Sequence, residues 1–154
     1  MPPTDTSAAL STPKVLVVGT TADYIEWIRT RYPGEALFIT ASSVRQSAQE
    51  PVPDPSEELV CDLSDTAALM TAVSAHMNTW SQTAAGIACF DCEAMITASR
   101  LAKILGLSYP GESAILNCRD KLISKQLWQT QGVPCPRVWP GWRCTWLVAP
   151  KTKA

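Results

Sequence analysis

Four short apolar runs, each followed by polar turn residues, constrain the fold of this chain most strongly. The runs cover residues 14–19, 36–40, 58–63 and 86–90. They are almost continuously apolar, which is typical of parallel strands that are buried on both faces. Segments with helical spacing separate most of the runs. This alternation predicts an α/β fold, a Rossmann-like parallel sheet of four to five strands with helices on both faces.

The expected helices begin at residues that commonly cap helix N-termini. They cover residues 21–32, 64–80 and 93–105, and one further turn is expected near 44–48. Thr21 or Asp23 is the cap candidate for the first helix, and Ser64 or Asp65 for the second. Gly106 fits the C-terminal cap of the third.

Composition divides the chain into four parts. Residues 1–13 are rich in proline, serine and threonine and are expected to be a flexible leader, not a signal peptide. Residues 14–108 form the expected Rossmann-like domain, and residues 109–136 a helical linker. Residues 137–154 are expected to be an irregular tail. The tail carries Trp139, Trp142 and Trp146, an aromatic density that makes a homodimer a possible assembly.

Several classes of partner and location are disfavoured by the sequence. The net charge of −1 offers no basic surface for nucleic acid. No apolar run approaches the roughly 20 residues needed to cross a membrane. The six cysteines come without a secretory signal, so we interpret them as reduced thiols of a cytoplasmic protein.

Polar residues follow the first and fourth strands, where a parallel sheet commonly binds its ligand. Gly19, Thr20 and Thr21 follow the first strand, and Asp91 and Glu93 follow the fourth. Because ligands of such sheets bind beyond the carboxyl ends of the strands, these five residues are the predicted contacts of a small-molecule substrate. The first loop lacks the GxGxxG spacing, which disfavours a dinucleotide.

Other candidates have plainer explanations. Cys89 and Cys92 form one CxxC pair, which is half a zinc site or a redox pair, but Cys89 falls within an expected strand and packing is favoured. His76 is the only histidine and lies at the edge of an apolar helical face. We therefore predict no metal site and no catalytic residue.

A further helix is expected to start around Arg119–Lys121 and to stop at Gly132–Pro134. Lys121 and Lys125 lie one turn apart on the same face. The opposite arc is expected to be buried; it carries Leu122, Ile123 and Leu127. Two lysines on one helical face are commonly solvated, and contact with phosphate is the alternative.

Four motifs between residues 98 and 136 agree in order and spacing with a known family. They are ASRLAKILGL (98–107), YPG (109–111), NCRDK (117–121) and QGVPCP (131–136). Together they resemble the segment that joins the first two domains of ATP-grasp ligases, such as biotin carboxylase and carbamoyl phosphate synthetase. The resemblance implies that residues 14–108 are a pre-ATP-grasp domain and that the tail begins a truncated ATP-grasp domain.

The resemblance also implies an activity and its nucleotide contacts. It implies an ATP-dependent carboxylate–amine ligase whose full-length form uses ATP and Mg²⁺. Lys121 is the implied phosphate contact, and Lys151 or Lys153 stands near the place of a second one, where this sequence has Ala149. Because the rest of the ATP-grasp domain is missing, we expect no tightly bound cofactor and no activity of this chain alone. The alternative is a stand-alone module for small-molecule binding or assembly.

Overall fold

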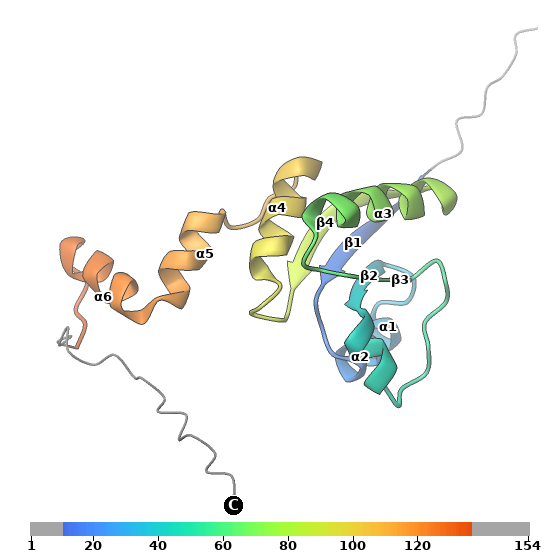
Figure 1. The fold of residues 1–154 in the computed structure, drawn as a ribbon, viewed down its shortest axis with the longest axis horizontal. Helices are drawn as coiled ribbons and strands as arrows, with labels where there is room; N and C mark the ends of the chain where they lie inside the picture. The colour runs from blue at the N-terminus through green and yellow to red at the C-terminus, as the bar shows by residue number, and fades with distance from the viewer. Residues whose placement is uncertain (1–10, 137–154) are drawn as a thin grey trace, which may run out of the picture. The chain divides into compact units, whose positions relative to one another are not determined.

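The computed structural model describes residues 11–136 and contains one four-stranded sheet. Its strands are β1 (Thr12–Val18), β2 (Ala36–Ala41), β3 (Glu58–Cys61) and β4 (Gln82–Cys89). All three strand pairs are parallel, and the spatial order is β3-β2-β1-β4 (Figure 1). The predicted parallel sheet is therefore confirmed, with four strands among the described residues.

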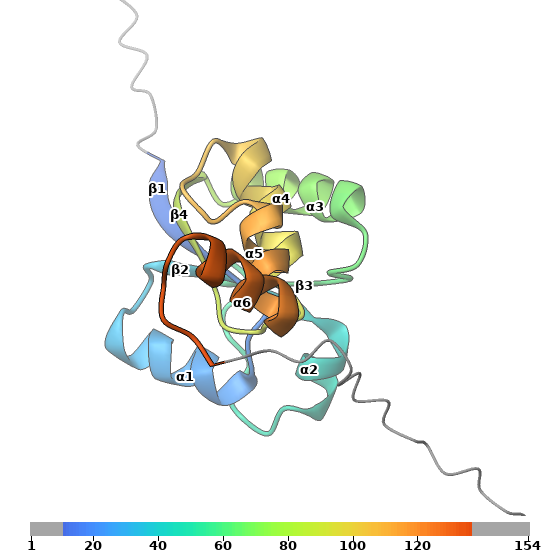
Figure 2. The ribbon, with the colours of Figure 1, turned by 90° about the vertical axis from the view of Figure 1, so that its left-hand side faces the viewer.

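Helices cover both faces of this sheet, as predicted. They are α1 (Ala22–Arg31), α2 (Ser42–Ser47), α3 (Thr66–Thr79) and α4 (Met95–Leu105). Figure 1 and Figure 2 both show α3 on one side of the strands and α1 on the other. No described helix has the length and apolar character needed to cross a membrane.

The core consists of two layers, because successive side chains of a strand point to opposite faces. Leu16 and Val18 of β1 pack with residues of α3 and α4, whereas Val17 between them packs with residues of α1. The first layer also holds Leu37, Ile39, Leu69, Val73, Ala94, Ala98 and Leu101, and the second holds Ile25, Ile28, Ala36 and Phe38. Strands buried on both faces explain why the runs in the sequence show no polar alternation.

Two strands begin earlier than predicted. β1 begins at Thr12, inside the expected leader, and β4 begins at Gln82, ahead of the expected start at 86. The two extensions pair with each other, with Thr12 opposite Gln82 and Lys14 opposite Ala84. These extensions contain polar residues that do not predict a strand by themselves. They form strand because each segment pairs with the other.

The structure places the helix ends close to the predicted caps. Asp65 caps α3, since its Oδ1 accepts hydrogen bonds from the backbone N–H groups of Ala67 and Ala68, both at 3.0 Å. Gly106 ends α4 as predicted. However, α4 begins at Met95 and not at Glu93, because Asp91 Oδ1 accepts the N–H of Glu93 at 3.0 Å and holds a turn there.

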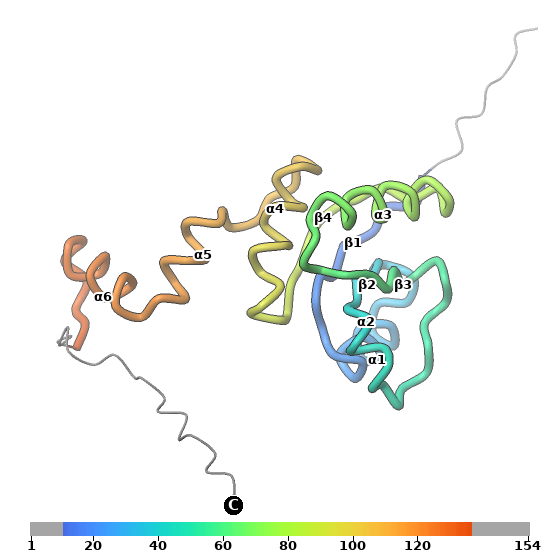
Figure 3. The backbone as a smooth tube through the Cα atoms, in the orientation of Figure 1, coloured from blue at the N-terminus to red at the C-terminus, as the bar shows by residue number. Residues whose placement is uncertain are grey.

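The chain divides into two compact units, and the division follows Ile115. It falls inside α5 (Glu112–Arg119), which lies within the expected helical linker, although no separate helix was predicted there. α6 (Lys121–Thr130) follows α5 along the chain (Figure 3). Asp120 caps it, since its Oδ1 accepts hydrogen bonds from the backbone N–H groups of Leu122 and Ile123. Arg119 therefore ends α5 and does not start α6.

The expected burial on α6 is wrong for the described residues. Leu122, Ile123 and Leu127 are each about 40% exposed, and no residue of α6 is buried. An amphipathic helix buries its apolar arc only where another element lies against it. The described part of the second unit contains just the end of α5, α6 and the turn after it, too little chain to enclose a core.

Candidate substrate-binding site

A cavity lies at the carboxyl edge of the sheet, at the point where the strand order reverses. From β1 the chain proceeds to β2 and β3 on one side and then returns to β4 on the other. The crevice beside such a switch point is the usual ligand site of open α/β sheets. The cavity has a volume of about 240 Å³ and is lined by Thr20, Thr21, Tyr24, Val44, Phe90 and Asp91.

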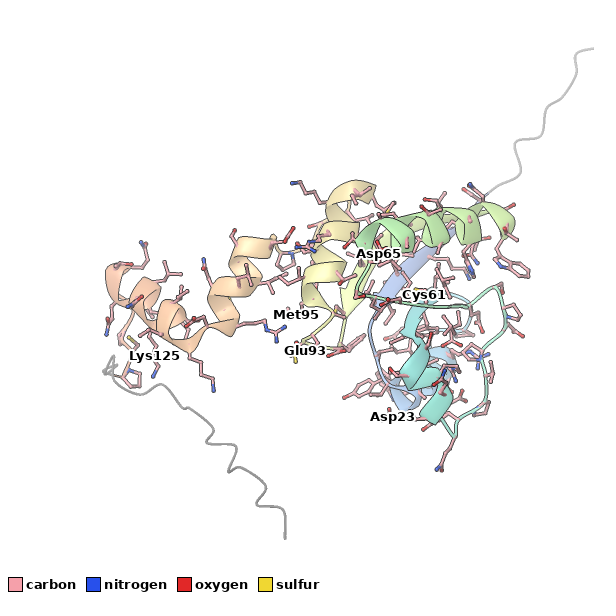
Figure 4. The ribbon with its side chains drawn as sticks, viewed as in Figure 1. Asp23, Cys61, Asp65, Glu93, Met95 and Lys125 are labelled. Atoms are coloured by element: carbon pink, nitrogen blue, oxygen red, sulfur yellow. The ribbon has the colours of Figure 1, made fainter. Side chains whose placement is uncertain are left out.

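Three of the five predicted substrate contacts line this cavity: Thr20, Thr21 and Asp91. Gly19 lies next to them but is not part of the lining, and neither is Glu93, which lies in the turn before α4 (Figure 4). The structure therefore brings the two predicted loops together. Substrate binding by any of the five residues stays a prediction.

Gly19 fixes the geometry of this edge. Its φ is +65°, and a Cβ added there would lie 2.5 Å from Cβ of Ala94 and 3.2 Å from Cβ of Asp91. Its carbonyl oxygen accepts the N–H of Asp91 at 3.1 Å, and its own N–H donates to the carbonyl of Ile39 at 3.1 Å. A glycine is thus required for the β1 loop to approach the β4 loop so closely.

The Thr20 hydroxyl is buried without a partner. Thr20 is 5% exposed, and no hydrogen bond from the described residues reaches its Oγ1. Buried polar side chains are nearly always hydrogen-bonded, so a buried hydroxyl without a partner calls for an explanation. Since Thr20 also lines the cavity, a bound ligand is one such explanation.

Sequence reasoning missed the apolar wall of the cavity. Tyr24 and Phe90 stack with ring centroids 5.8 Å apart and ring planes at 22°, and about half of each side chain is exposed. Val44 of α2 adds an aliphatic side chain. The sequence shows only that one aromatic residue follows the first strand and that another follows the fourth; that the two rings stack depends on the strand order.

The charges around the cavity are negative. Asp91 lines it, and none of its described lining residues is basic. Asp23 of α1 neighbours the lining residue Tyr24, and a hydrogen bond from the Thr21 side chain holds the pKa of the Asp23 carboxyl below its usual value. Asp23 is thus held ionised at the first turn of α1, where the helix dipole favours an anion. Figure 4 labels Asp23 at that helix.

The two CxxC cysteines lie at the end of β4 and in the turn before α4. Burial raises the pKa of the Cys89 thiol, which disfavours the thiolate, and its Sγ donates to the carbonyl oxygen of Asp91 at 3.1 Å. Cys92 lies in the turn before Met95, where α4 begins. Among the residues that the structure describes, no group of three or more metal-ligating side chains is placed to hold an ion.

The second unit has a hollow of its own, about 390 Å³ in volume. Lys121, Lys125 and Trp128 border it, together with Asn117, Cys118, Ser124 and Leu127. The Ser124 hydroxyl donates to the carbonyl oxygen of Asn117, which ties the start of α6 to the end of α5. The two lysines therefore flank one hollow, as their spacing predicts; the other implied nucleotide contact, Lys151, lies outside the described residues, as does Lys153.

The strand order and the switch-point cavity define a Rossmann-like α/β domain. This fold is similar to that in a crystal structure of an L-amino acid ligase from Bacillus licheniformis, with a TM-score of 0.58 and 17% sequence identity. The match covers 83% of this chain and 32% of the ligase chain, so this chain spans about a third of that ligase. At this identity the likeness shows the fold alone. No protein-family model and no curated protein matches the sequence.

Proposed function

We propose that the first unit is the N-terminal substrate-binding domain of an ATP-dependent carboxylate–amine ligase of the ATP-grasp class. The observation that carries this proposal is the cavity at the switch point of a fold that is similar to the fold of a solved ligase. Further support comes from the four motifs of residues 98–136, which resemble the linker of that class.

In the proposed reaction, a carboxylate takes the γ-phosphoryl group of ATP and ADP leaves. A neutral amine then attacks the acyl carbon, phosphate leaves, and the amine nitrogen loses a proton. The residues of this chain would contribute binding and orientation. Lys121 is the proposed contact of the nucleotide phosphates, because an ammonium on a flexible stem suits a phosphate as a point charge. Lys121 also lies in the first turn of α6, and the dipole at a helix N-terminus favours a bound anion such as phosphate.

The described residues fit part of a nucleotide site. Lys121 and Lys125 supply positive charge, and Trp128 supplies a flat apolar surface at the same hollow. They offer no cluster of ligands for Mg²⁺, so we assign no metal site.

Nuclear magnetic resonance titration with a non-hydrolysable ATP analogue and Mg²⁺ tests this role. We expect amide shift changes centred on α6 that diminish with salt, since the contact is electrostatic. Lys121→Ala should abolish most of the change. Lys125→Ala is the matched control, because it removes the same charge from the same hollow. Equal effects of the two variants would assign the response to general attraction and contradict a specific role for Lys121.

A second candidate function is assembly, without catalysis. Its supporting observation is the exposed apolar surface of α5, α6 and the turn that follows, which carries Leu116, Leu122, Ile123, Leu127, Trp128 and Val133. Such a surface commonly marks an interaction site. A homodimer formed through it is the simplest form of this candidate.

A further inference from the structure

We propose that the switch-point cavity binds the amine partner of the ligation, as an ammonium ion on an apolar stem. The assignment of that amine to a ligation rests on the proposed function. The binding chemistry rests on four features of the cavity itself: its carboxylate, its unpartnered hydroxyl, its aromatic pair and the lack of a basic residue among its described lining.

Asp91 supplies the charge that an ammonium group needs. Its Oδ1 accepts the N–H of Glu93 at 3.0 Å, and no donor among the described residues bonds to its Oδ2. The carboxylate is held in place by the first bond, and the second oxygen remains available. Hydrogen bonds between ionised partners are among the strongest that proteins make.

Thr20 supplies a second acceptor. Its buried Oγ1 has no partner in the described chain, and a hydroxyl can accept a hydrogen bond from a bound ammonium. Leaving such a group unsatisfied costs free energy in the empty protein. A ligand that donates to Thr20 removes this cost, which links the unusual burial of the hydroxyl to binding.

Tyr24 and Phe90 supply the surface for the stem. The stacked pair and Val44 offer an apolar wall next to the carboxylate. Aromatic faces also attract cations through their quadrupole. A carboxylate group would not be attracted by these faces and would be repelled by Asp91.

The other charged groups near the cavity do not reverse this preference. The dipole of α1 favours an anion at its N-terminus, but the ionised Asp23 already occupies its first turn. Arg45 follows Val44 on α2, but it does not line the cavity, and its Nη2 lies 2.6 Å from Oε1 of Glu58. The cavity therefore presents negative charge.

Two probes that differ in the charged group test the proposal. Phenethylamine carries an ammonium and 3-phenylpropionate a carboxylate, each on the same phenyl ring and two methylenes. We expect phenethylamine to shift the amide resonances of Thr20, Thr21, Phe90 and Asp91 and to bind more tightly than the acid. Asp91→Asn should weaken its binding about tenfold, the scale of one charged hydrogen bond.

Asp62→Asn is the control for Asp91, because Asp62 holds the same kind of turn after β3, where its Oδ1 accepts the N–H of Ser64 at 2.8 Å. It lies outside the lining and should leave affinity unchanged. Thr20→Val should weaken binding about threefold without lowering the midpoint of thermal unfolding, since it removes an unsatisfied buried hydroxyl. Thr40→Val removes a second buried threonine hydroxyl that has no partner among the described residues, and should leave binding unchanged.

Tighter binding of 3-phenylpropionate, or binding of neither probe at these residues, would overturn the amine assignment. Loss of binding with Asp62→Asn as large as with Asp91→Asn would do the same. The proposed function fails separately, through the nucleotide titration of α6. If phenethylamine binds but the nucleotide analogue causes no amide shift changes, the assignment of the cavity to an amine is supported and the proposed ligase function is contradicted.

Discussion

The two units differ in how much of their apolar surface they bury. In the first unit, alternate strand residues pack into two core layers under α1 on one face and α3 and α4 on the other. In the second, α6 has a comparable apolar arc but no buried residue. Both helical patterns are readable in the sequence. The difference teaches that periodicity predicts the element, whereas burial depends on what lies against it.

The largest test of this difference compares two leucines. Leu101→Ala on α4 removes a side chain that is 0% exposed and should lower the free energy of unfolding by about 2–5 kcal/mol. Leu127→Ala on α6 removes the same atoms from a side chain that is 42% exposed and should cost less than about 1 kcal/mol. Urea unfolding of both variants gives the comparison.

The same Leu127 variant tests the assembly candidate. If the α6 surface joins two copies, wild-type protein sediments as a dimer and Leu127→Ala shifts the population toward monomer. A dependence of unfolding on protein concentration would accompany it. A wild-type protein that sediments as a monomer at all concentrations would contradict the homodimer. For the stability comparison, a loss of unfolding free energy in Leu127→Ala as large as that in Leu101→Ala would contradict the difference in burial between the two units.

Two of the glycines with positive φ in the first unit allow the cost of a steric clash to be distinguished from the cost of backbone strain. Gly19→Ala places a Cβ 2.5 Å from that of Ala94 at φ +65°, and should destabilise by about 3 kcal/mol, because the loops must separate. Gly34→Ala has φ +74° but no atom within 4 Å, and should cost about 1 kcal/mol. Thermal unfolding measures both. Equal costs would show that the β1 and β4 loops do not approach as closely as this site requires.

Much of the first unit could be predicted from its sequence. The four strands, the helices around them and the caps Asp65 and Gly106 are signalled by local patterns. Thr20, Thr21 and Asp91 could be assigned to one edge because strand ends of a parallel sheet meet there.

What could not be predicted depends on contacts between distant segments. The pairing of Thr12 with Gln82 extends two strands through polar residues. The stacking of Tyr24 on Phe90 requires the strand order, which brings α1 beside the end of β4. Burial of the Thr20 hydroxyl has no local signal either, because threonine after a strand is an ordinary turn residue.

The smallest expected effect concerns an ion pair at the end of the first unit. The side chain of Arg100 on α4 donates two hydrogen bonds to Oε2 of Glu112, at 3.1 and 3.0 Å. The hydrogen bonds and charge of Arg100 hold the pKa of the Glu112 carboxyl below its usual value. A carboxyl whose pKa is lower in the folded protein than in the unfolded chain stabilises the fold at pH values above its unfolded-state pKa. This stabilisation is lost as the pH falls through the pKa of the carboxyl in the folded protein.

Arg100→Gln should therefore raise the pKa of Glu112 toward its ordinary value, which titration of its carboxyl carbon by nuclear magnetic resonance detects. Both side chains are more than 40% exposed, so the variant should barely change the unfolding midpoint at neutral pH, and added salt should reduce the difference further. The lost attachment should instead increase amide hydrogen exchange at the start of α5, in the first unit, and leave α6 unaffected. An unchanged Glu112 pKa would show that the pair does not persist in solution, and the first turn of α5 would then behave like the poorly buried second unit.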